Sequence, residues 1–312
     1  MTRPGELVLR RVRLSEPGPA DLVVETEWSG ISTGTERLLW TGRMPPFPGL
    51  GYPLVPGYET VGRVAAAGPE AGVDVGRRVF VPGASCFGEI RGLFGGAASR
   101  LVVPGARVVP IPDRIEDRGT LLALAATAHH AMGPALESDS GPTLVVGHGA
   151  LGRLLARLLA ARGETPVVWE TNPERQGGAD GYMVVDPRAD RVEPPGYRRI
   201  IDVSGDARAI DGLVGKLARG GELVLAGFYA DRVSFDFPPA FMKEARFRIA
   251  AEFSPGDLAA VMSLVEQGQM SLDGLISHRA VVDPDRSPEE AYRTAFGDPS
   301  CLKMVLDWRE TR

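Results

Sequence analysis

The sequence has little cysteine. Cys86 and Cys301 are the two cysteines among 312 residues, too few for the disulfide framework of a small secreted domain. Charged residues interrupt the apolar residues of the N-terminus, so it lacks the apolar segment of a secretory signal peptide. No run approaches the roughly 18 uninterrupted apolar residues typical of a transmembrane helix. We therefore expect a cytoplasmic protein with no integral membrane segment.

The sequence also lacks an excess of basic residues. It has 35 Lys and Arg against 40 Asp and Glu, a formal net charge of −5. Nucleic-acid binding usually requires a basic face, so this balance argues against a nucleic-acid partner. Hydrophobic residues make up 44% of the chain, which is ordinary for globular proteins. The length suits two domains.

Short β-type segments, separated by glycine and proline, fill the chain to about residue 118. Residues 6–14, 21–28 and 60–68 are rich in β-branched residues or alternate in polarity, which predicts strands of a barrel-like β module. Beyond this point short apolar runs alternate with helical spacing, which predicts a doubly wound parallel sheet. The strand-like 302–308 could return to the first module.

The most specific motif is "TLVVGHGALGRLLARLLAARG", residues 143–163. Gly147, Gly149 and Gly152 form G-x-G-x-x-G between a predicted strand and a predicted helix, the fingerprint of dinucleotide binding. The helix N-terminus offers free N–H groups to phosphates. Glu170 ends the next predicted strand, where a carboxylate binds ribose hydroxyls and repels a 2′-phosphate, so NAD is favoured over NADP. We expect His148 to face solvent or phosphate.

With these motifs identified, the whole chain resembles the medium-chain dehydrogenase/reductase superfamily. "VPGYETVGRVAAAG", "GRRVFV" and "GELVLAGF" resemble three of its conserved segments. The resemblance implies an α/β fold: a mainly β, GroES-like catalytic domain at 1–118 with 255–312, and a Rossmann dinucleotide-binding domain at 119–254. It also implies a homo-oligomer. The cofactor-binding residues that we expect are Gly147, Gly149, Ala150, Leu151, Gly152, Glu170, Arg175, Ser204, Gly227 and Phe228.

Longer phrases narrow the resemblance. "SGISTGTERLLWTGRMPPFPGLGYPLVPGYE", "RGLFGGAASRLVVP" and "FPPAFMKEARFRIAAE" are similar to the bacteriochlorophyllide dehydrogenases of bacteriochlorophyll biosynthesis. That resemblance implies NAD-dependent oxidation of a 3-(1-hydroxyethyl) group of a magnesium bacteriochlorin to 3-acetyl. Two other functions stay open: a zinc-free quinone or enone reductase of the same superfamily, and a pigment-binding protein without catalysis.

The zinc ligands of metal-dependent relatives are missing. The resemblance places Ser32, Tyr58 and, before the "TAHHA" segment, Ala123 at their positions, whereas catalytic zinc requires about three protein ligands. We therefore expect no metal. Some group must still hold the developing alkoxide and accept the proton. Tyr58 with Glu59 is the preferred pair and Ser32 or Thr33 the hydrogen-bonding partner; His130 is a further candidate. Alternatively, Tyr58 fills the space left by zinc, and Glu59 and His130 are structural.

A bacteriochlorin is flat and mostly apolar and carries a carboxylate, so its site requires apolar walls and a cation. The segments 41–53 and 91–99 could form such walls, or could be an ordinary surface crossover and a shortened loop. The substrate-binding residues that we expect are Thr35, Arg43, Phe47, Tyr52, Arg91 and Phe94.

Overall fold

The computed structural model describes residues 1–46, 48–135, 141–190 and 196–311. It divides into two compact units, one of Met1–Ala123 with Leu275–Arg312 and one of Leu124–Gly274. The sequence prediction placed 255–274 in the first unit, whereas the structure groups them with the second. Hydrogen bonds explain the difference: Asp257 accepts from His129 and His130, and Arg157 donates to backbone carbonyls within 271–273.

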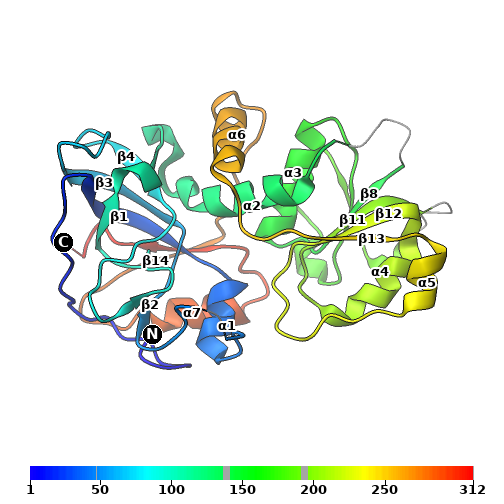
Figure 1. Ribbon diagram of the computed structural model, residues 1–312, viewed down its shortest axis with the longest axis horizontal. Helices are drawn as coiled ribbons and strands as arrows, with labels where there is room; N and C mark the ends of the chain where they lie inside the picture. The colour runs from blue at the N-terminus through cyan, green and yellow to red at the C-terminus, as the bar shows by residue number, and fades with distance from the viewer. Residues whose placement is uncertain (47, 136–140, 191–195, 312) are drawn as a thin grey trace. The chain divides into compact units, whose positions relative to one another are not determined.

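The first unit contains a seven-stranded, mostly antiparallel sheet (Figure 1). Its strand order is β14-β15-β1-β3-β4-β7, and β6 pairs with β1. A two-stranded sheet joins β2 to β5. The strands are β1 (Asp21–Ile31), β2 (Leu54–Val55), β3 (Thr60–Ala67), β4 (Arg78–Val81), β5 (Arg91–Gly92), β6 (Arg100–Pro104), β7 (Val109–Pro110), β14 (His278–Val281) and β15 (Met304–Asp307). The helices are α1 (Thr35–Thr41), α7 (Glu289–Gly297) and the 3₁₀ turns η1 (Gly105–Arg107) and η2 (Asp113–Leu121).

Strand β15 confirms the predicted return of the C-terminal segment. It pairs antiparallel with β1, with Trp28 opposite Asp307 and Ile31 opposite Met304. The strand predicted at 6–14 is wrong, because that segment belongs to no strand of the structure. Its polarity does alternate: Leu9 packs on one apolar cluster, and Val12 and Leu14 pack on another. These apolar side chains are thus packed on the unit while the arginines of the segment stay more exposed, which does not by itself require pairing in a sheet.

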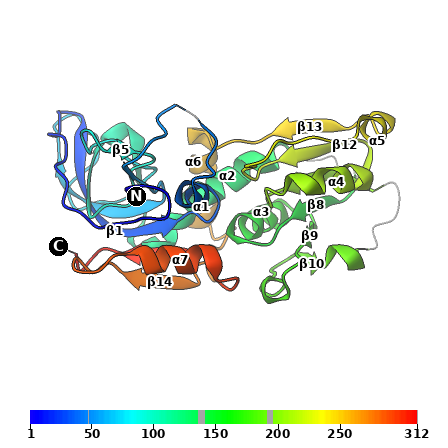
Figure 2. The same ribbon diagram turned by 90° about the horizontal axis from the view of Figure 1, so that it is seen from below.

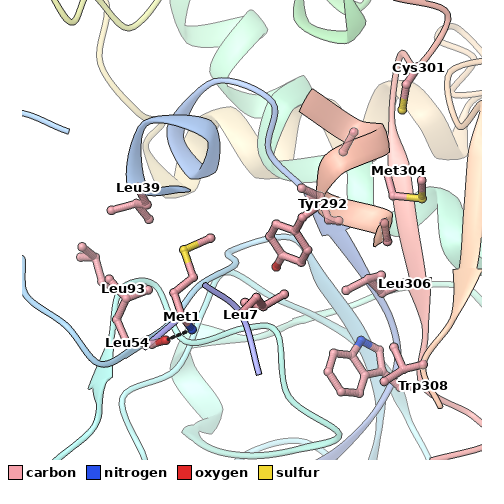
Figure 3. Close-up of a cluster of buried hydrophobic side chains, with 14 of the residues drawn as sticks. Met1, Leu7, Leu39, Leu54, Leu93, Tyr292, Cys301, Met304, Leu306 and Trp308 are labelled. Atoms are coloured by element: carbon pink, nitrogen blue, oxygen red, sulfur yellow. Dashed lines mark hydrogen bonds between the residues drawn. The ribbon is translucent and has the colours of Figure 1, made fainter. Parts of the chain in front are cut away.

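An apolar cluster anchors α1 and α7 to the first unit (Figure 3). Leu39 from α1, Tyr292 from α7 and Leu306 from β15 belong to this cluster and are each at most 2% exposed. Burying a side chain of this kind stabilises the folded state by roughly 1.5–3 kcal/mol. The cluster therefore fixes α1, which begins at the end of the hydroxyl-rich segment 30–35, "GISTGT".

The second unit is a six-stranded parallel sheet with strand order β10-β9-β8-β11-β12-β13. This is the doubly wound order of dinucleotide-binding domains, so the predicted fold class is confirmed. Figure 2 shows α5 as the short helix that joins β12 to β13. The strands are β8 (Thr143–Val146), β9 (Val167–Trp169), β10 (Met183–Val185), β11 (Tyr197–Asp202), β12 (Leu217–Leu225) and β13 (Arg246–Ile249). The helices are α2 (Leu122–Met132), α3 (Ala150–Ala161), α4 (Ile210–Lys216), α5 (Phe237–Met242), α6 (Pro255–Glu266) and the turns η3 (Pro173–Arg175), η4 (Pro187–Ala189) and η5 (Ala207–Ala209).

Within the described ranges, no helix is long and apolar enough to cross a membrane. Both cysteines are buried.

Candidate active site and cofactor site

The three fingerprint glycines of the second unit each meet a different steric demand. Gly147 ends β8 with a φ of +104°, a conformation that favours glycine. A Cβ at Gly152 would lie 1.9 Å from the Gly147 carbonyl oxygen, so α3 can approach the strand only with glycine there. A Cβ at Gly149 would meet no described atom within 4 Å. The open space at Gly149 faces the position where the fingerprint predicts a pyrophosphate.

The N-terminus of α3 is left free to bind an anion. Gly149 is its N-cap and supplies no side-chain hydrogen bond, and Ala150 and Leu151 are the first helical residues. The first N–H groups of a helix have no partner within the helix, and the helix dipole places positive charge there. Ala150 and Leu151 therefore lie at a helix end that can bind an anion, and their role in cofactor binding stays a prediction.

Glu170 lies directly after β9 and is 9% exposed. One carboxylate oxygen accepts a hydrogen bond from the backbone N–H of His148 at 3.1 Å, and the other accepts from Asn172 at 2.7 Å. The carboxylate is therefore fixed beside the glycine turn. Each oxygen keeps a further lone pair to accept a ligand hydroxyl.

The prediction for His148 is wrong. Its side chain is fully buried, and its two ring nitrogens contact the Arg175 carbonyl at 2.6 Å and the Tyr182 hydroxyl at 2.8 Å. Burial lowers the pKa of His148 to about 4. Arg153 also binds the Arg175 carbonyl and the His148 carbonyl. His148 thus holds the segment after Glu170 against the glycine turn, and the Arg175 backbone is one of its anchors.

The remaining predicted cofactor residues follow the carboxyl ends of β11 and β12. Ser204 donates its backbone N–H to the Asp202 carboxylate at 2.9 Å, and Gly227 donates its own to the Asp202 carbonyl at 3.0 Å. Phe228 follows and is 49% exposed. β8, β11 and β12 are neighbouring parallel strands, so these residues gather at the sheet edge where α/β folds bind ligands.

In the first unit, a pair of hydroxyl groups joins two of the predicted catalytic positions. The Ser32 Oγ lies 2.7 Å from the Tyr58 hydroxyl. Ser32 follows β1 and Tyr58 precedes β3, and these strands are paired. The Thr35 side chain also hydrogen-bonds Tyr58. Phe94 contacts the Tyr58 ring edge-on at a centroid distance of 5.3 Å. The structure therefore brings four of the predicted site residues together around the Tyr58 side chain: Ser32, Thr35, Tyr58 and Phe94.

The phenol of Tyr58 is held in its protonated form. Burial raises its pKa well above the ordinary value, and the charge of Glu59 raises it further, against the opposing effect of the Ser32 and Thr35 hydrogen bonds. Near neutral pH, Tyr58 is therefore a hydrogen-bond donor and not a phenolate base.

Glu59, the residue after Tyr58, forms a buried ion pair. Both of its carboxylate oxygens accept from the Lys303 ammonium, at 2.8 and 2.6 Å, and Lys303 also donates to the Ile31 carbonyl. Glu59 is 0% and Lys303 1% exposed. A Cβ at Gly30 would lie 2.2 Å from a Glu59 oxygen, so Gly30 makes room for the pair.

The other predicted residues do not join the hydroxyl pair through a contact that the structure gives. Thr33, Arg43 and Arg91 are exposed, and the Tyr52 hydroxyl donates to the Leu39 carbonyl. His130 belongs to the second unit, where its ring contacts Asp257 at 3.0 Å. Phe47 lies outside the described residues.

Two full-length relatives decide the family. The chain is 56% identical to 2-desacetyl-2-hydroxyethyl bacteriochlorophyllide A dehydrogenase of Cereibacter sphaeroides, over 100% of the chain and 98% of the relative. It is 58% identical to the protein of the same name from Rhodobacter capsulatus, over 96% and 94%. The chain belongs to this dehydrogenase family. It is a member of the medium-chain dehydrogenase/reductase superfamily, and residues 18–113 match the alcohol dehydrogenase GroES-like domain.

Solved structures of more distant dehydrogenases share the fold of this family member. The 2R,3R-butanediol dehydrogenase of Bacillus subtilis matches with a TM-score of 0.83 at 21% identity, over 98% of each chain. An acetophenone reductase of Geotrichum candidum, solved with NAD, matches with a TM-score of 0.80 at 20% identity, over 97% and 94%. At these identities the likeness carries the fold and no more.

Sequence reasoning missed two buried charged residues close to the predicted catalytic positions. Lys303 lies in the strand-like segment "LKMVLDW". A lysine in a mostly apolar strand indicates a buried charge that requires an oppositely charged partner. Glu36 stands in the first turn of α1 and is 0% exposed. Its only sequence signal was an acidic residue placed directly after the hydroxyl-rich corner.

Proposed function

We propose that this protein oxidises the 3-(1-hydroxyethyl) group of 3-hydroxyethyl bacteriochlorophyllide a, or of a related chlorophyllide, to 3-acetyl in bacteriochlorophyll biosynthesis, with NAD as oxidant. The observation that carries the proposal is the identity of 56–58% with two dehydrogenases named for the 2-desacetyl-2-hydroxyethyl pigment. The Ser32–Tyr58 pair supplies hydroxyl groups suited to an alcohol substrate.

The two hydroxyls bind the reacting oxygen. Tyr58 stays protonated, so it donates a hydrogen bond to the substrate oxygen as negative charge develops there. Ser32 completes the contact and orients the Tyr58 hydroxyl. Donors already in place for a developing oxyanion are worth several kcal/mol of the activation barrier. When bound, NAD would supply the hydride acceptor for the carbinol carbon. The carbinol hydroxyl proton would pass along the Ser32 and Tyr58 hydroxyls to water, so that neither side chain ends ionised. Glu59 is a structural partner of Lys303 in this proposal.

The preference for NAD is assigned to Glu170. Its carboxylate is fixed beside the glycine turn by two backbone N–H groups. A fixed negative charge repels a 2′-phosphate and accepts ribose hydroxyls. Ala150, Leu151 and the glycines bind the pyrophosphate, whereas Ser204, Gly227 and Phe228 line the nicotinamide end.

A zinc-free reaction is part of the proposal because the donor set does not suit the metal. Serine and tyrosine hydroxyls hold two of the ligand positions, and they hydrogen-bond each other. Zinc prefers thiolate, imidazole and carboxylate ligands. Glu59 is a carboxylate, but Lys303 engages both of its oxygens. Catalysis unaffected by a chelator would support this part of the proposal, and activity restored by added zinc would contradict it.

The substrate side is proposed around the hydroxyl pair. Thr35 and Phe94, which contact Tyr58, would pack beside the hydroxyethyl group. Arg43 and Arg91 are exposed cations on the two predicted wall segments and would pair with the pigment carboxylate.

The test is to mix purified protein with 3-hydroxyethyl bacteriochlorophyllide a and NAD. Oxidation brings a carbonyl into conjugation, so the long-wavelength pigment band should shift to the red as NADH forms. Pigment binding without a shift would favour the non-catalytic alternative. NADPH consumption with the 3-vinyl analogue, and none with the alcohol, would favour a double-bond reductase. NADP in place of NAD is the control for the cofactor assignment.

We also propose that the protein is a homo-oligomer that pairs through the second unit. β13 is an edge strand of its sheet, and an unpaired edge is a template for pairing with another copy. Exposed apolar side chains surround it, and patches of this kind mark association sites. They are Phe235, Phe237, Phe241, Met242, Phe247 and Ile249, the α5–β13 face. Sedimentation analysis of Phe241→Glu and of Ile249→Glu should give monomers, whereas Val75→Glu, an exposed valine of the first unit, should not.

A further inference from the structure

Glu36 is a buried carboxylic acid to which the mechanism above gives no role. It lies in the first turn of α1, and its side chain is 0% exposed. Burying a carboxyl group is costly unless hydrogen bonds or charges compensate for the loss of water. A polar residue would not be needed to anchor this short helix, because Leu39 already binds it to the apolar cluster.

Two hydrogen bonds join Glu36 to Ser32, and the Glu36 carboxyl group also interacts with the Tyr292 side chain of α7. The carboxylate Oε1 accepts a hydrogen bond from the Ser32 backbone N–H at 3.0 Å. The Glu36 backbone N–H donates to the Ser32 carbonyl at 3.1 Å. One residue thus binds both backbone polar groups of Ser32. The other oxygen, Oε2, is buried and makes no hydrogen bond of ordinary geometry to the described residues.

We propose that Glu36 is the positioning residue of the catalytic hydroxyl pair: its carboxyl group fixes the Ser32 backbone so that the Ser32 Oγ stays on the Tyr58 hydroxyl. The inference rests on the proposed function, because it gives Glu36 a role in the same alcohol oxidation. Ser32 follows the end of β1, and the two hydrogen bonds from Glu36 to its backbone, here called the clamp, act with the Tyr58 contact to fix its side-chain direction. Small displacements of a positioned group can cost large factors in rate.

Charged groups from several elements face the Glu36 carboxyl. Burial raises its pKa to about 7; the Ser32 N–H opposes this rise and the charge of Glu59 adds to it. Tyr292 of α7 and Lys303 lower the pKa. The Met1 amino group and Tyr58 also interact with the Glu36 charge. The ionised form accepts the Ser32 N–H more strongly than the neutral acid does, so the clamp tightens as the pH rises through neutrality.

Two substitutions separate the clamp from the charge. Glu36→Gln keeps a carbonyl oxygen to accept the Ser32 N–H, whereas Glu36→Leu removes the acceptor. We expect kcat of the Leu variant to fall about tenfold or more, with the KM for NAD unchanged. The Gln variant should retain kcat to within about threefold at alkaline pH, and its pH–kcat profile should lack the step near pH 7. Wild-type kcat in the Leu variant, or equal losses in both variants, would overturn the proposal.

A double-mutant cycle tests whether Glu36 acts through Ser32. Ser32→Ala removes the hydroxyl, and in that background Glu36→Leu should cause no further loss of kcat. Additive losses would show that Glu36 acts elsewhere and would overturn the proposal. Ser29→Ala is the matched control, because Ser29 lies buried on β1, the strand that Ser32 follows, and accepts a hydrogen bond from the Trp308 indole. In that background the full effect of Glu36→Leu should persist.

A measurement without substrate keeps the inference separate from the proposed function. In protein labelled with ¹⁵N-serine, the Ser32 amide is the resonance that Ser32→Ala removes. Its proton shift should titrate near pH 7 in the wild type and be constant in Glu36→Gln. A Ser32 amide that does not titrate would overturn the clamp, whatever the pigment assay gives. If the Ser32 amide titrates near pH 7 but the protein does not oxidise the pigment, the proposed function is rejected and the clamp is upheld.

Discussion

The Ser32 hydroxyl lies 2.7 Å from the Tyr58 hydroxyl, although the residues are 26 positions apart. The family resemblance places these two residues where zinc-using members of the superfamily carry a cysteine and a histidine ligand. By our proposal, the hydrogen-bonded hydroxyl pair stands in place of those ligands and stabilises the developing charge by donating hydrogen bonds instead of through a Lewis acid.

Removing the Tyr58 hydroxyl should reduce catalysis without unfolding the protein. We expect Tyr58→Phe to lower kcat about 10²–10³-fold, the usual effect of losing one oxyanion donor. The ring contact with Phe94 remains, so the thermal midpoint should hold. Steady-state kinetics with the hydroxyethyl pigment measures the change. Tyr52→Phe is the matched control: it loses a hydroxyl bound to the Leu39 carbonyl and should lose about 0.5–1.5 kcal/mol of stability but not kcat. Full activity of Tyr58→Phe would exclude its proposed role.

Cofactor selectivity should change when Glu170 loses its charge. Glu170→Gln can retain one of the two backbone contacts, at His148 or Asn172, while the repulsion of a 2′-phosphate disappears. We expect the ratio of kcat/KM for NAD over NADP to fall about tenfold, equivalent to about 1.4 kcal/mol. Glu164→Gln is the control, because Glu164 binds the Thr143 hydroxyl away from the glycine turn. An unchanged ratio in Glu170→Gln would assign selectivity to another residue.

The grouping of the predicted cofactor residues at one edge of the sheet could be predicted because its signals are local in the sequence. The glycines, Glu170 and the strand ends each follow a short apolar run, and the order of a doubly wound sheet brings such ends together. The direction of His148 could not be predicted in the same way. It depends on Tyr182, 34 residues away on a separate loop.

The site in the first unit was less predictable, because it too depends on contacts between residues far apart in the sequence. Lys303 reaches Glu59 across 244 positions, and a single sequence holds no signal for a contact of that length. The strand predicted at 6–14 was wrong because an alternating pattern indicates which side chains are buried, and not which backbone segments pair in a sheet. Glu36 was visible as an acid beside a hydroxyl-rich corner, but its burial depends on how Leu39 and Tyr292 pack.

Acidification should destabilise the folded protein through His148. Its folded-state pKa of about 4 lies below the ordinary value of 6.5. The unfolded chain therefore binds the extra proton first, and stability falls as the pH drops from about 6.5 towards 4. Urea unfolding of the wild type and of His148→Asn, across this range, isolates the effect. The variant should be less stable at pH 8, and the difference should shrink on acidification. A difference that is constant with pH would contradict the burial of a neutral imidazole.

Changing Gly149 or Gly152, the second and third glycines of the fingerprint, to alanine should impair different properties of the protein. At Gly152 the new methyl would lie 1.9 Å from the Gly147 carbonyl oxygen, so α3 must shift away from β8 and the free energy of unfolding should fall by about 1–3 kcal/mol. At Gly149 the methyl meets no described atom within 4 Å, and φ is −74°, which alanine adopts freely. Gly149→Ala should therefore keep its stability and lose NAD affinity, because the methyl occupies the approach of the pyrophosphate. Urea unfolding and NAD titration by calorimetry, applied to both variants, separate the two effects. Equal destabilisation of both, or NAD affinity retained in Gly149→Ala, would contradict this division of roles.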